Sequence, residues 1–504
     1  MEGISRQLQG KYPDGRIASA IFCAFVTSIL LVILEAFSPI QKQTDIAHVL
    51  VWVLQVSSMT LGIIAMSLIF WTAYQHTKCK TENESESRSD DPSMGLKLLF
   101  LWFFAFSLLL QTSFSLAIDL DCLFKGEARP FPLLLSAFST LISMTFTIVQ
   151  VGFISYAREA DLPKTSKAVL CLLTVVVANL AIWFNSFVRD QNNLFAIGNI
   201  SQYLNQSLLR NETLCFWKSP IQKVAEGLLP YLVPARLEFG LFASSFLLRL
   251  LPICSKSHRQ RAPAHKFDGR VNDPRNDSNV TGRDNAEMRQ EKMIAIIISI
   301  ILNFPVLIVT FLIFIPRSYN LTSLYSTWIG LRTLNSFLFI TLLLYGLHNL
   351  HKESSTGNCQ TQITIMDSVL LFSTAGHVGY FSIGLLSSLL CKCTFYGIVS
   401  TKNALLILNS ILQTIFILQG RRCGKPDHPL KWARFVCLLL SITNFYWWIE
   451  SSFTDIRKHN NFELEDILLG KKMWTIINQF LYPMVTFYEF ICCIELYRLY
   501  KVLG

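Results

Sequence analysis

Long apolar stretches alternate with short polar segments along the whole chain. A helix that rises 1.5 Å per residue needs roughly 20 apolar residues to cross a hydrocarbon core of about 30 Å. Because such stretches recur, we predict about twelve membrane-spanning helices. Their expected ranges are 17–38, 47–74, 95–118, 131–156, 165–188, 224–253, 292–316, 324–350, 364–391, 397–419, 430–453 and 472–500.

One long polar segment divides these helices into two groups of six. Residues 254–291 are rich in Arg, Asn, Asp and Pro and hold too few apolar residues to build a core, so we predict a disordered cytoplasmic linker. The predicted class is all-α, a polytopic membrane protein with six-helix halves at 17–253 and 292–500. Short cytoplasmic termini, 1–16 and 501–504, complete the chain. Because six is even, both halves enter the membrane in the same direction, which permits a pseudo-symmetric parallel repeat.

Polar residues recur at corresponding places in the two halves. A Gln on the fourth helix of each half precedes an Asn on the fifth helix, by 29 residues in the first half and 31 in the second. A weaker echo places a Glu before a Phe on the sixth helix of each half. These residues are Gln150, Asn179 and Glu238 in the first half, and Gln413, Asn444 and Glu489 in the second.

The repeated residues have the chemistry of a proton pathway. A charged side chain at mid-membrane depth costs about 2.5 to 3.5 kcal/mol, so such groups point into the bundle. A single buried amide more often joins two helices than conducts, but the repeat favours function. Burial disfavours the charged form of a carboxylate, which lets Glu238 and Glu489 exchange protons near neutral pH. Neutral amides can hold a water chain without a fixed charge that attracts metal cations.

Other ionisable groups in the predicted helices have structural interpretations. We expect Arg332 to pair or to extend toward the membrane surface, and His377 to be a core histidine. Glu450 lies near a helix end, where a structural and a functional role are equally expected. Asp367, near the start of a helix, is expected at the interface.

Composition and charge agree with a membrane protein. The 504 residues are 52% hydrophobic and only 15% charged, which excludes an ordinary soluble domain. The net charge of +10 comes from short loops without a basic and aromatic stripe, so we predict no nucleic-acid partner. With a cytoplasmic N-terminus, inward segments carry about twice the Lys and Arg of outward ones, which predicts that both termini are cytoplasmic.

The loop between the fifth and sixth predicted helices gives a second indication of orientation. Three glycosylation triplets begin there, at Asn199, Asn205 and Asn211, although two further triplets fall in a loop predicted to be cytoplasmic. Cys122 and Cys215 lie in predicted external loops and could pair, while most of the thirteen cysteines lie in or beside apolar helices, as free thiols do. His and Cys show no metal-ligand spacing, and we expect no metal and no cofactor.

Several motifs in combination resemble the otopetrins, a family of proton channels with twelve helices in two six-helix halves. They are Gln150 to Ile154, Ala178 to Trp183, Pro230 to Pro234 with Glu238, Gln413 to Leu418, Asn444 to Phe453, and Trp474 to Ile476 followed by Pro483 and Phe487-Tyr488. Two departures stand out. The family usually has Phe-Tyr-Arg-Phe-His-Ser on its last helix, where this chain has Phe487-Tyr488-Glu489-Phe490-Ile491-Cys492, and a Tyr where this chain has Phe239.

The resemblance implies a homodimer whose halves each form a barrel-like bundle. It implies proton paths through each half and between the halves, opened by extracellular acid, with protons and the lipid bilayer as partners and a sterol between the halves as a further candidate. The residues expected to form the pathway are Gln150, Asn179, Glu238, Gln413, Asn444, Tyr488 and Glu489.

We therefore predict a proton-selective channel of the plasma membrane, and two alternatives stay open. A proton-coupled secondary transporter would also have parallel halves, but it should contain helices broken at mid-depth, of which the sequence has few. A nonconducting relative with a regulatory role is compatible with the altered last helix. An enzyme would need a convergent set of His, Asp or metal ligands, for which His377 alone is a poor basis.

Overall fold

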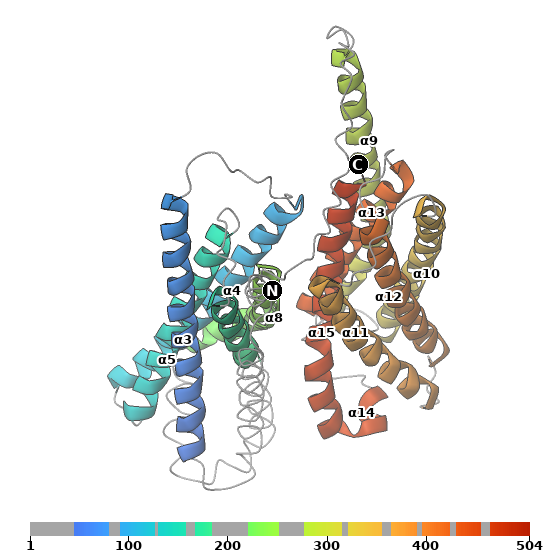
Figure 1. Ribbon diagram of the computed structural model, residues 1–504. Coiled ribbons are helices and arrows are strands. Elements are labelled where there is room, and N and C mark those ends of the chain that lie inside the picture. Colours follow the sequence, from blue (N-terminus) through green and yellow to red (C-terminus); the bar gives the residue numbers. More distant parts are fainter. Residues whose placement is uncertain are drawn as a thin grey trace, which may run out of the picture.

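The computed structural model describes eleven segments of the chain, and almost all of their residues are helical (Figure 1). They cover residues 45–79, 91–125, 130–157, 167–183, 220–250, 277–314, 321–354, 364–390, 396–423, 430–454 and 464–503. No strand occurs in these segments. The first predicted span, 17–38, and the triplets at Asn199, Asn205 and Asn211 lie outside them.

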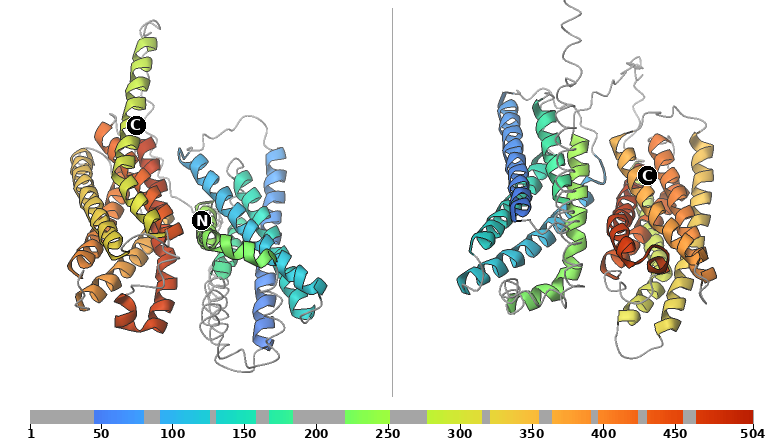
Figure 2. Two further views of the ribbon diagram at one scale, coloured as in Figure 1. Left: turned by 180° about the vertical axis from the view of Figure 1, so that it is seen from behind. Right: turned by 90° about the horizontal axis from the view of Figure 1, so that it is seen from below.

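The helices form two bundles that lie side by side (Figures 1 and 2). The N-terminal bundle contains α3 (Asp45–Cys79), α4 (Met94–Lys125), α5 (Pro130–Ala157), the helix Lys167–Trp183 and α8 (Pro220–Leu250). The C-terminal bundle contains α9 (Asp277–Phe314), α10 (Leu321–Ser354), α11 (Ile365–Leu390), α12 (Tyr396–Cys423), α13 (Lys431–Thr454), α14 (Leu464–Leu469) and α15 (Lys471–Val502). The all-α, polytopic class is confirmed.

Eight described helices are long and apolar enough to cross a membrane. They lie in α3, α4, α5, α9, α10, α11, α12 and α15. Lys167–Trp183 is a shorter apolar helix, and α8 and α13 are 31 and 24 residues long. The total of twelve spans and the parallel repeat therefore stay predictions.

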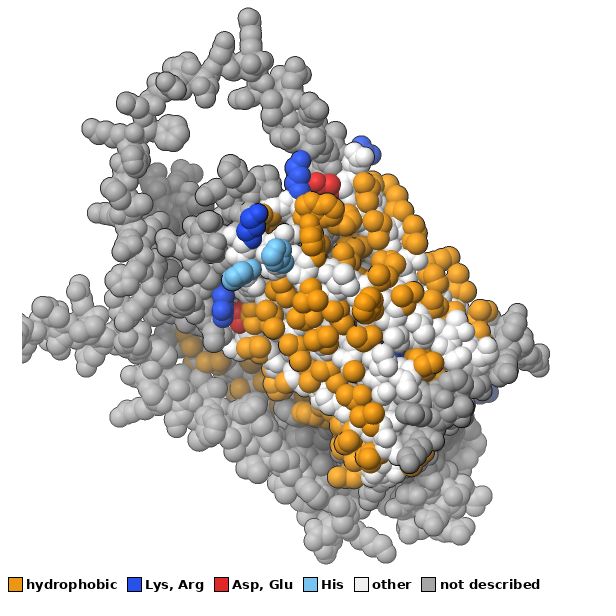
Figure 3. Space-filling view, turned by 90° about the vertical axis from the view of Figure 1, so that its right-hand side faces the viewer, with side chains coloured by type: hydrophobic (Ala, Val, Ile, Leu, Met, Phe, Trp, Pro, Cys, Tyr) orange, Lys and Arg blue, Asp and Glu red, His pale blue; other side chains and the backbone are white. Residues whose placement is uncertain are grey.

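The distribution of side chains is the reverse of that in a soluble protein. Large apolar side chains face outward, such as those of Leu99, Phe106 and Phe337, each more than half exposed. Figure 3 shows a broad apolar surface over the C-terminal bundle, with charged side chains near one end. In the interior lie polar side chains, including Gln150, Gln413, Asn444 and Glu238. Lipid solvates the apolar exterior, and the polar side chains are enclosed by the helices.

Helix α9 begins earlier than the sequence analysis expects. Its first turns, from Asp277, lie within the segment 254–291 assigned to a linker, and α9 projects beyond the bundle in Figure 1. Adding a residue to an existing helix costs far less than starting a new one, so an apolar helix can extend into adjoining polar sequence. The residues Ala286 to Lys292 are suited to this, since most of them are strong helix formers.

Aromatic side chains form the seam between the two bundles. Helix α8 packs against α11, α13 and α15 of the other half. The ring centroid of Phe490 on α15 lies 4.9 Å from that of Phe242 on α8, and 5.0 and 5.1 Å from those of Phe100 and Phe104 on α4. Trp448 on α13 contacts Phe104 at 5.9 Å. These edge-to-face pairs are favourable beyond simple area burial, and they hold the halves in contact.

Ion pairs join the halves at the end of the molecule where α15 ends. Lys97 of α4 lies 3.1 Å from Asp91 and 3.2 Å from Glu495 of α15, and all three side chains are nearly fully buried. Arg249 of α8 also pairs with Asp91. Arg421 of α12 pairs with Glu495, at 2.8 Å, and the other pairs in this cluster are Arg421–Asp367, Arg498–Asp91 and Arg498–Glu495. Asp367, expected at the interface, thus takes part in an ion pair.

Candidate functional site

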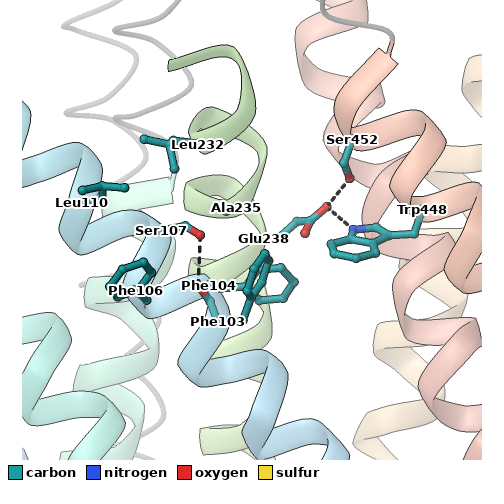
Figure 4. A pocket seen from close by; sticks show the side chains of 10 residues that line it. All are labelled: Phe103, Phe104, Phe106, Ser107, Leu110, Leu232, Ala235, Glu238, Trp448 and Ser452. Atoms are coloured by element: carbon teal, nitrogen blue, oxygen red, sulfur yellow. Dashed lines mark hydrogen bonds between the residues drawn. The ribbon is translucent and has the colours of Figure 1, made fainter. Parts of the chain in front are cut away.

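Glu238 of α8 lies buried at the seam between the two halves. Its side chain is 2% exposed and extends toward α13 (Figure 4). Trp448 Nε1 donates a hydrogen bond to Glu238 Oε1 at 2.7 Å, and Ser452 Oγ donates to the same oxygen at 3.3 Å. The second oxygen, Oε2, has no hydrogen-bond partner among the described residues. A carboxyl group from one half therefore depends on donors from the other.

A cavity of about 220 Å³ opens beside this carboxyl group. Most of its wall is apolar, and the polar groups are those of Glu238, Ser452, Trp448 and Ser107. The other lining residues are Phe103, Phe104, Phe106, Leu110, Leu232 and Ala235. Figure 4 shows the Glu238 carboxylate directed from the cavity toward the α13 donors. The cavity is large enough for several water molecules beside a titratable group.

In the C-terminal half, Gln413 of α12 and Asn444 of α13 hydrogen-bond each other. Gln413 Nε2 donates to Asn444 Oδ1 at 2.9 Å, and Asn444 Nδ2 donates to Gln413 Oε1 at 3.3 Å. Asn444 Nδ2 also donates to Leu440 O at 2.7 Å. The structure thus brings together two of the predicted pathway residues as a reciprocal amide pair.

The corresponding amides of the N-terminal half are arranged differently. Gln150 of α5 is completely buried, and neither polar atom of its side chain has a hydrogen-bond partner among the described residues. Asn179 donates to Val175 O of its own helix at 3.0 Å. Gly240 of α8 lies close to this helix, since a Cβ there would be 3.5 Å from Asn179 O. No hydrogen bond joins Gln150 to Asn179 in the described part of the chain.

Tyr488 of α15 belongs to a group of hydroxyls and one imidazole in the C-terminal half. Its hydroxyl donates to Ser410 O at 2.9 Å and lies 3.3 Å from Thr414 Oγ1. Ser410 Oγ lies 2.7 Å from His377 Nδ1, and Thr414 Oγ1 lies 2.9 Å from Thr374 Oγ1. His377 is buried, as expected of a core histidine, but it lies beside a predicted pathway residue.

Glu489, the residue after Tyr488, faces a different set of groups. Its Oε1 lies 4.0 Å from Nη2 of Arg332 on α10, and the same nitrogen lies 3.3 Å from Glu450 Oε2. Glu238 and Glu489 also interact electrostatically, so the seam site and this cluster adjoin. The two glutamates therefore occupy unlike environments, one beside neutral donors and the other beside a guanidinium.

A comparison with protein families supports the sequence resemblance. The family described as Otopetrin matches residues 196–490, more than half of the 504 residues. The chain belongs to the otopetrin family. A comparison with curated proteins finds no match.

Membership of the otopetrin family gives the broad function. This otopetrin is a multi-pass membrane protein, and its family is one of ion channels with proton-channel function rather than of enzymes. The matched region includes Glu238, Gln413, Asn444, Tyr488 and Glu489, whereas Gln150 and Asn179 precede it. In the described residues of this otopetrin, no three His, Cys, Asp or Glu side chains gather where they could hold a metal ion.

The sequence analysis missed several residues of these sites. Trp448 and Ser452 supply the donors to Glu238, yet nothing local in the sequence connects α13 with α8. For Arg332 the sequence predicts a structural role, and for Glu450 a structural and a functional role equally. Only their meeting with Glu489 shows a shared cluster. The sequence does contain one signal for Arg332 and Glu450. Charged side chains are rare within apolar helices, and each needs a partner there. Cys122 is disulfide-bonded, and Cys215 lies outside the described residues.

Proposed function

We propose that this otopetrin is a proton-selective channel of the plasma membrane, opened by extracellular acid, with both termini in the cytoplasm. The observation that carries the proposal is Glu238, a buried carboxyl group beside a cavity at the seam of the two halves. A proton needs only a titratable group and hydrogen-bonded neighbours to pass. A metal cation would also need oxygen ligands to replace its hydration shell.

The surroundings of Glu238 support proton transfer rather than metal transport. Trp448 offers a donor but no acceptor, and Ser452 offers a hydroxyl that can both donate and accept. Apart from Ser107, the rest of the cavity wall is apolar and offers few oxygen ligands to a metal ion. Protonation of the carboxyl group is therefore the exchange that this site supports best.

The buried amides and Tyr488 are further proposed residues of the proton pathway within the two halves. Gln150 is buried with its donors and acceptor unused by the described residues, so it can bind a water chain. Gln413 and Asn444 bond each other, and this pair must separate before water can pass between them. We propose that water enters the N-terminal half and the seam more readily than it enters the C-terminal half. A homodimer, a sterol between the halves, and glycans at Asn199, Asn205 and Asn211 complete the proposal.

Whole-cell patch clamp with an isosteric variant tests the function. The external pH is stepped from neutral to about 5, with sodium replaced by an impermeant cation. We expect an inward current whose reversal potential follows the proton gradient, and we expect Glu238→Gln to reduce it by roughly 10-fold, because an amide cannot exchange a proton at these pH values.

Asp121→Asn is the matched control. It also converts a carboxylate to an amide, but Asp121 belongs to an exposed ion pair with Lys125 at the end of α4, where it contributes little. Its current should equal that of the unaltered protein. If the unaltered protein reaches the cell surface without an acid-evoked current, the channel proposal is wrong and a nonconducting relative is favoured. An undiminished current in Glu238→Gln would remove Glu238 from the pathway.

A further inference from the structure

Arg332 contacts two carboxylates from different helices in the interior of the C-terminal half. Its Nη2 lies 3.3 Å from Oε2 of Glu450 on α13 and 4.0 Å from Oε1 of Glu489 on α15. The side chains of Arg332, Glu450 and Glu489 are 8%, 2% and 3% exposed. One cation therefore stands between two carboxylates that bulk water hardly reaches.

Other contacts hold this arrangement in place. Trp328 Nε1 donates to Glu450 Oε1 at 2.6 Å, and Thr310 Oγ1 lies 3.4 Å from the same oxygen. The Arg332 guanidinium carbon lies 4.7 Å from the centre of the Trp447 ring, which is close enough for a cation–π interaction. These contacts hold the guanidinium of Arg332 in one defined position.

Other charged or titratable groups lie near this site on the neighbouring helices. Lys402 of α12 lies over the Trp328 ring at 5.4 Å, and Arg332 acts electrostatically on His377 of α11. On the other side, Glu489 interacts with Glu238 of the N-terminal half. Without the Arg332 charge, the carboxylates of Glu450 and Glu489 would face one space.

We propose that Arg332 is a tethered cation that determines ion selectivity, since it occupies the place that a metal cation would take between Glu450 and Glu489. Hard cations such as Ca²⁺ bind several oxygen ligands at about 2.3 to 2.6 Å, and a pair of buried carboxylates is a typical part of such a set. A guanidinium that already neutralises both carboxylates excludes the metal, whereas a proton can still pass between neighbouring hydrogen-bonding groups. This selectivity role rests on the proposed channel function.

Sodium dependence of the acid-evoked current tests the selectivity role. Currents of the unaltered protein and Arg332→Lys should be the same whether external sodium is present or replaced by an impermeant cation, because both keep a tethered charge. In Arg332→Gln, external sodium should change the current at least 2-fold or move its reversal potential. Sodium-independent currents in Arg332→Gln would overturn the proposal.

Thermal unfolding of the purified protein gives a readout that needs no current. Calcium should raise the Tm of Arg332→Gln but not that of the unaltered protein, because a ligand bound only by the folded state stabilises it. Adding Glu489→Gln to Arg332→Gln should reduce the rise, because one of the two carboxylates is lost. The matched control is Arg434→Gln, which removes another buried arginine whose partner, Glu291, is one partly exposed carboxylate. Its Tm should not respond to calcium.

A second variant allows the proposal to be tested even if Arg332→Gln does not fold. The double variant Arg332→Gln with Glu450→Gln removes one charge of each sign and leaves the Glu489 carboxylate facing the vacated space. Its Tm should also rise with calcium, and no rise would overturn the proposal. Calcium binding by the variants without any current in the unaltered protein would refute the channel function, and with it the selectivity role, but not the exclusion of a metal ion by Arg332.

Discussion

At the scale of single residues, identical side-chain types have different surroundings in the two halves. Gln413 and Asn444 satisfy each other, while Asn179 bonds its own helix and Gln150 bonds no described residue. Glu238 likewise takes its donors from the opposite half. Removing a hydrogen-bond donor to Glu238 should therefore show how much that donor contributes to stability at the seam.

Trp448→Phe removes the indole donor to Glu238 while keeping an aromatic ring among Phe104, Phe445 and Phe490. Leaving a buried acceptor without its hydrogen bond costs about 1 to 3 kcal/mol, so we expect a loss of about that size in the free energy of unfolding. Thermal unfolding in detergent measures it. Trp432→Phe is the control because Trp432 is 63% exposed. Equal Tm values for the two variants would contradict the role of the hydrogen bond.

At the scale of helices, close approach depends on glycine at a few positions. A Cβ added at Gly376 of α11 would lie 2.4 Å from Met484 Cβ of α15, which is closer than any real contact. At Gly346 of α10 it would lie 2.9 Å from the Phe416 ring of α12. At Gly379, one turn along α11, the nearest atom would be 3.8 Å away, an ordinary contact. The same helix thus offers a test position and its control.

Gly376→Ala should destabilise the protein, because Met484 Cβ is fixed to the α15 backbone and cannot turn aside. Overpacking costs about 1 to 3 kcal/mol, and only part is offset by the higher helix propensity of alanine, about 1 kcal/mol. Gly379→Ala should keep the Tm or raise it slightly. The measurement is thermal unfolding of both variants. A Tm of Gly376→Ala at or above that of Gly379→Ala would show that α11 and α15 pack less closely than the structure indicates.

At the scale of the whole molecule, two different interactions join the halves. Aromatic rings fill the seam around Phe490, and ion pairs around Glu495 and Lys97 close one end of it. Asp91 precedes α4 and lies outside the membrane-spanning segments. Burial would raise its pKa, but Lys97 and Arg249 hold the pKa of Asp91 well below its usual range.

This lowered pKa predicts how stability depends on pH. A carboxylate whose pKa is lower in the folded state stabilises the protein above the unfolded-state pKa, and this contribution is lost as pH falls toward the folded-state pKa. Asp91→Asn should therefore lower stability at pH 7, by about 3 kcal/mol for a broken buried pair, and the difference should narrow below about pH 4. Tm values measured from pH 7 to pH 3 test this. Asp121→Asn, in an exposed pair, should show no such trend, and a constant Tm difference for Asp91→Asn would contradict it.

The sequence by itself determined the class of the protein and the burial of its polar residues. Hydropathy is a local property, so apolar windows predict membrane helices without knowledge of their neighbours. The cost of polar groups in lipid likewise predicted that Gln150, Glu238, Gln413 and Asn444 point inward, and all four are buried.

Only the tertiary structure decided which of these polar groups meet. Trp448 lies 210 residues from Glu238 in the chain, and Glu450 lies 118 residues from Arg332, so no local pattern could pair them. Periodicity places a side chain on one face of a helix, but the neighbour on that face depends on how the helices pack. The packing therefore made one glutamate a site with neutral donors and the other a partner of an arginine, although the sequence presents them as equivalent.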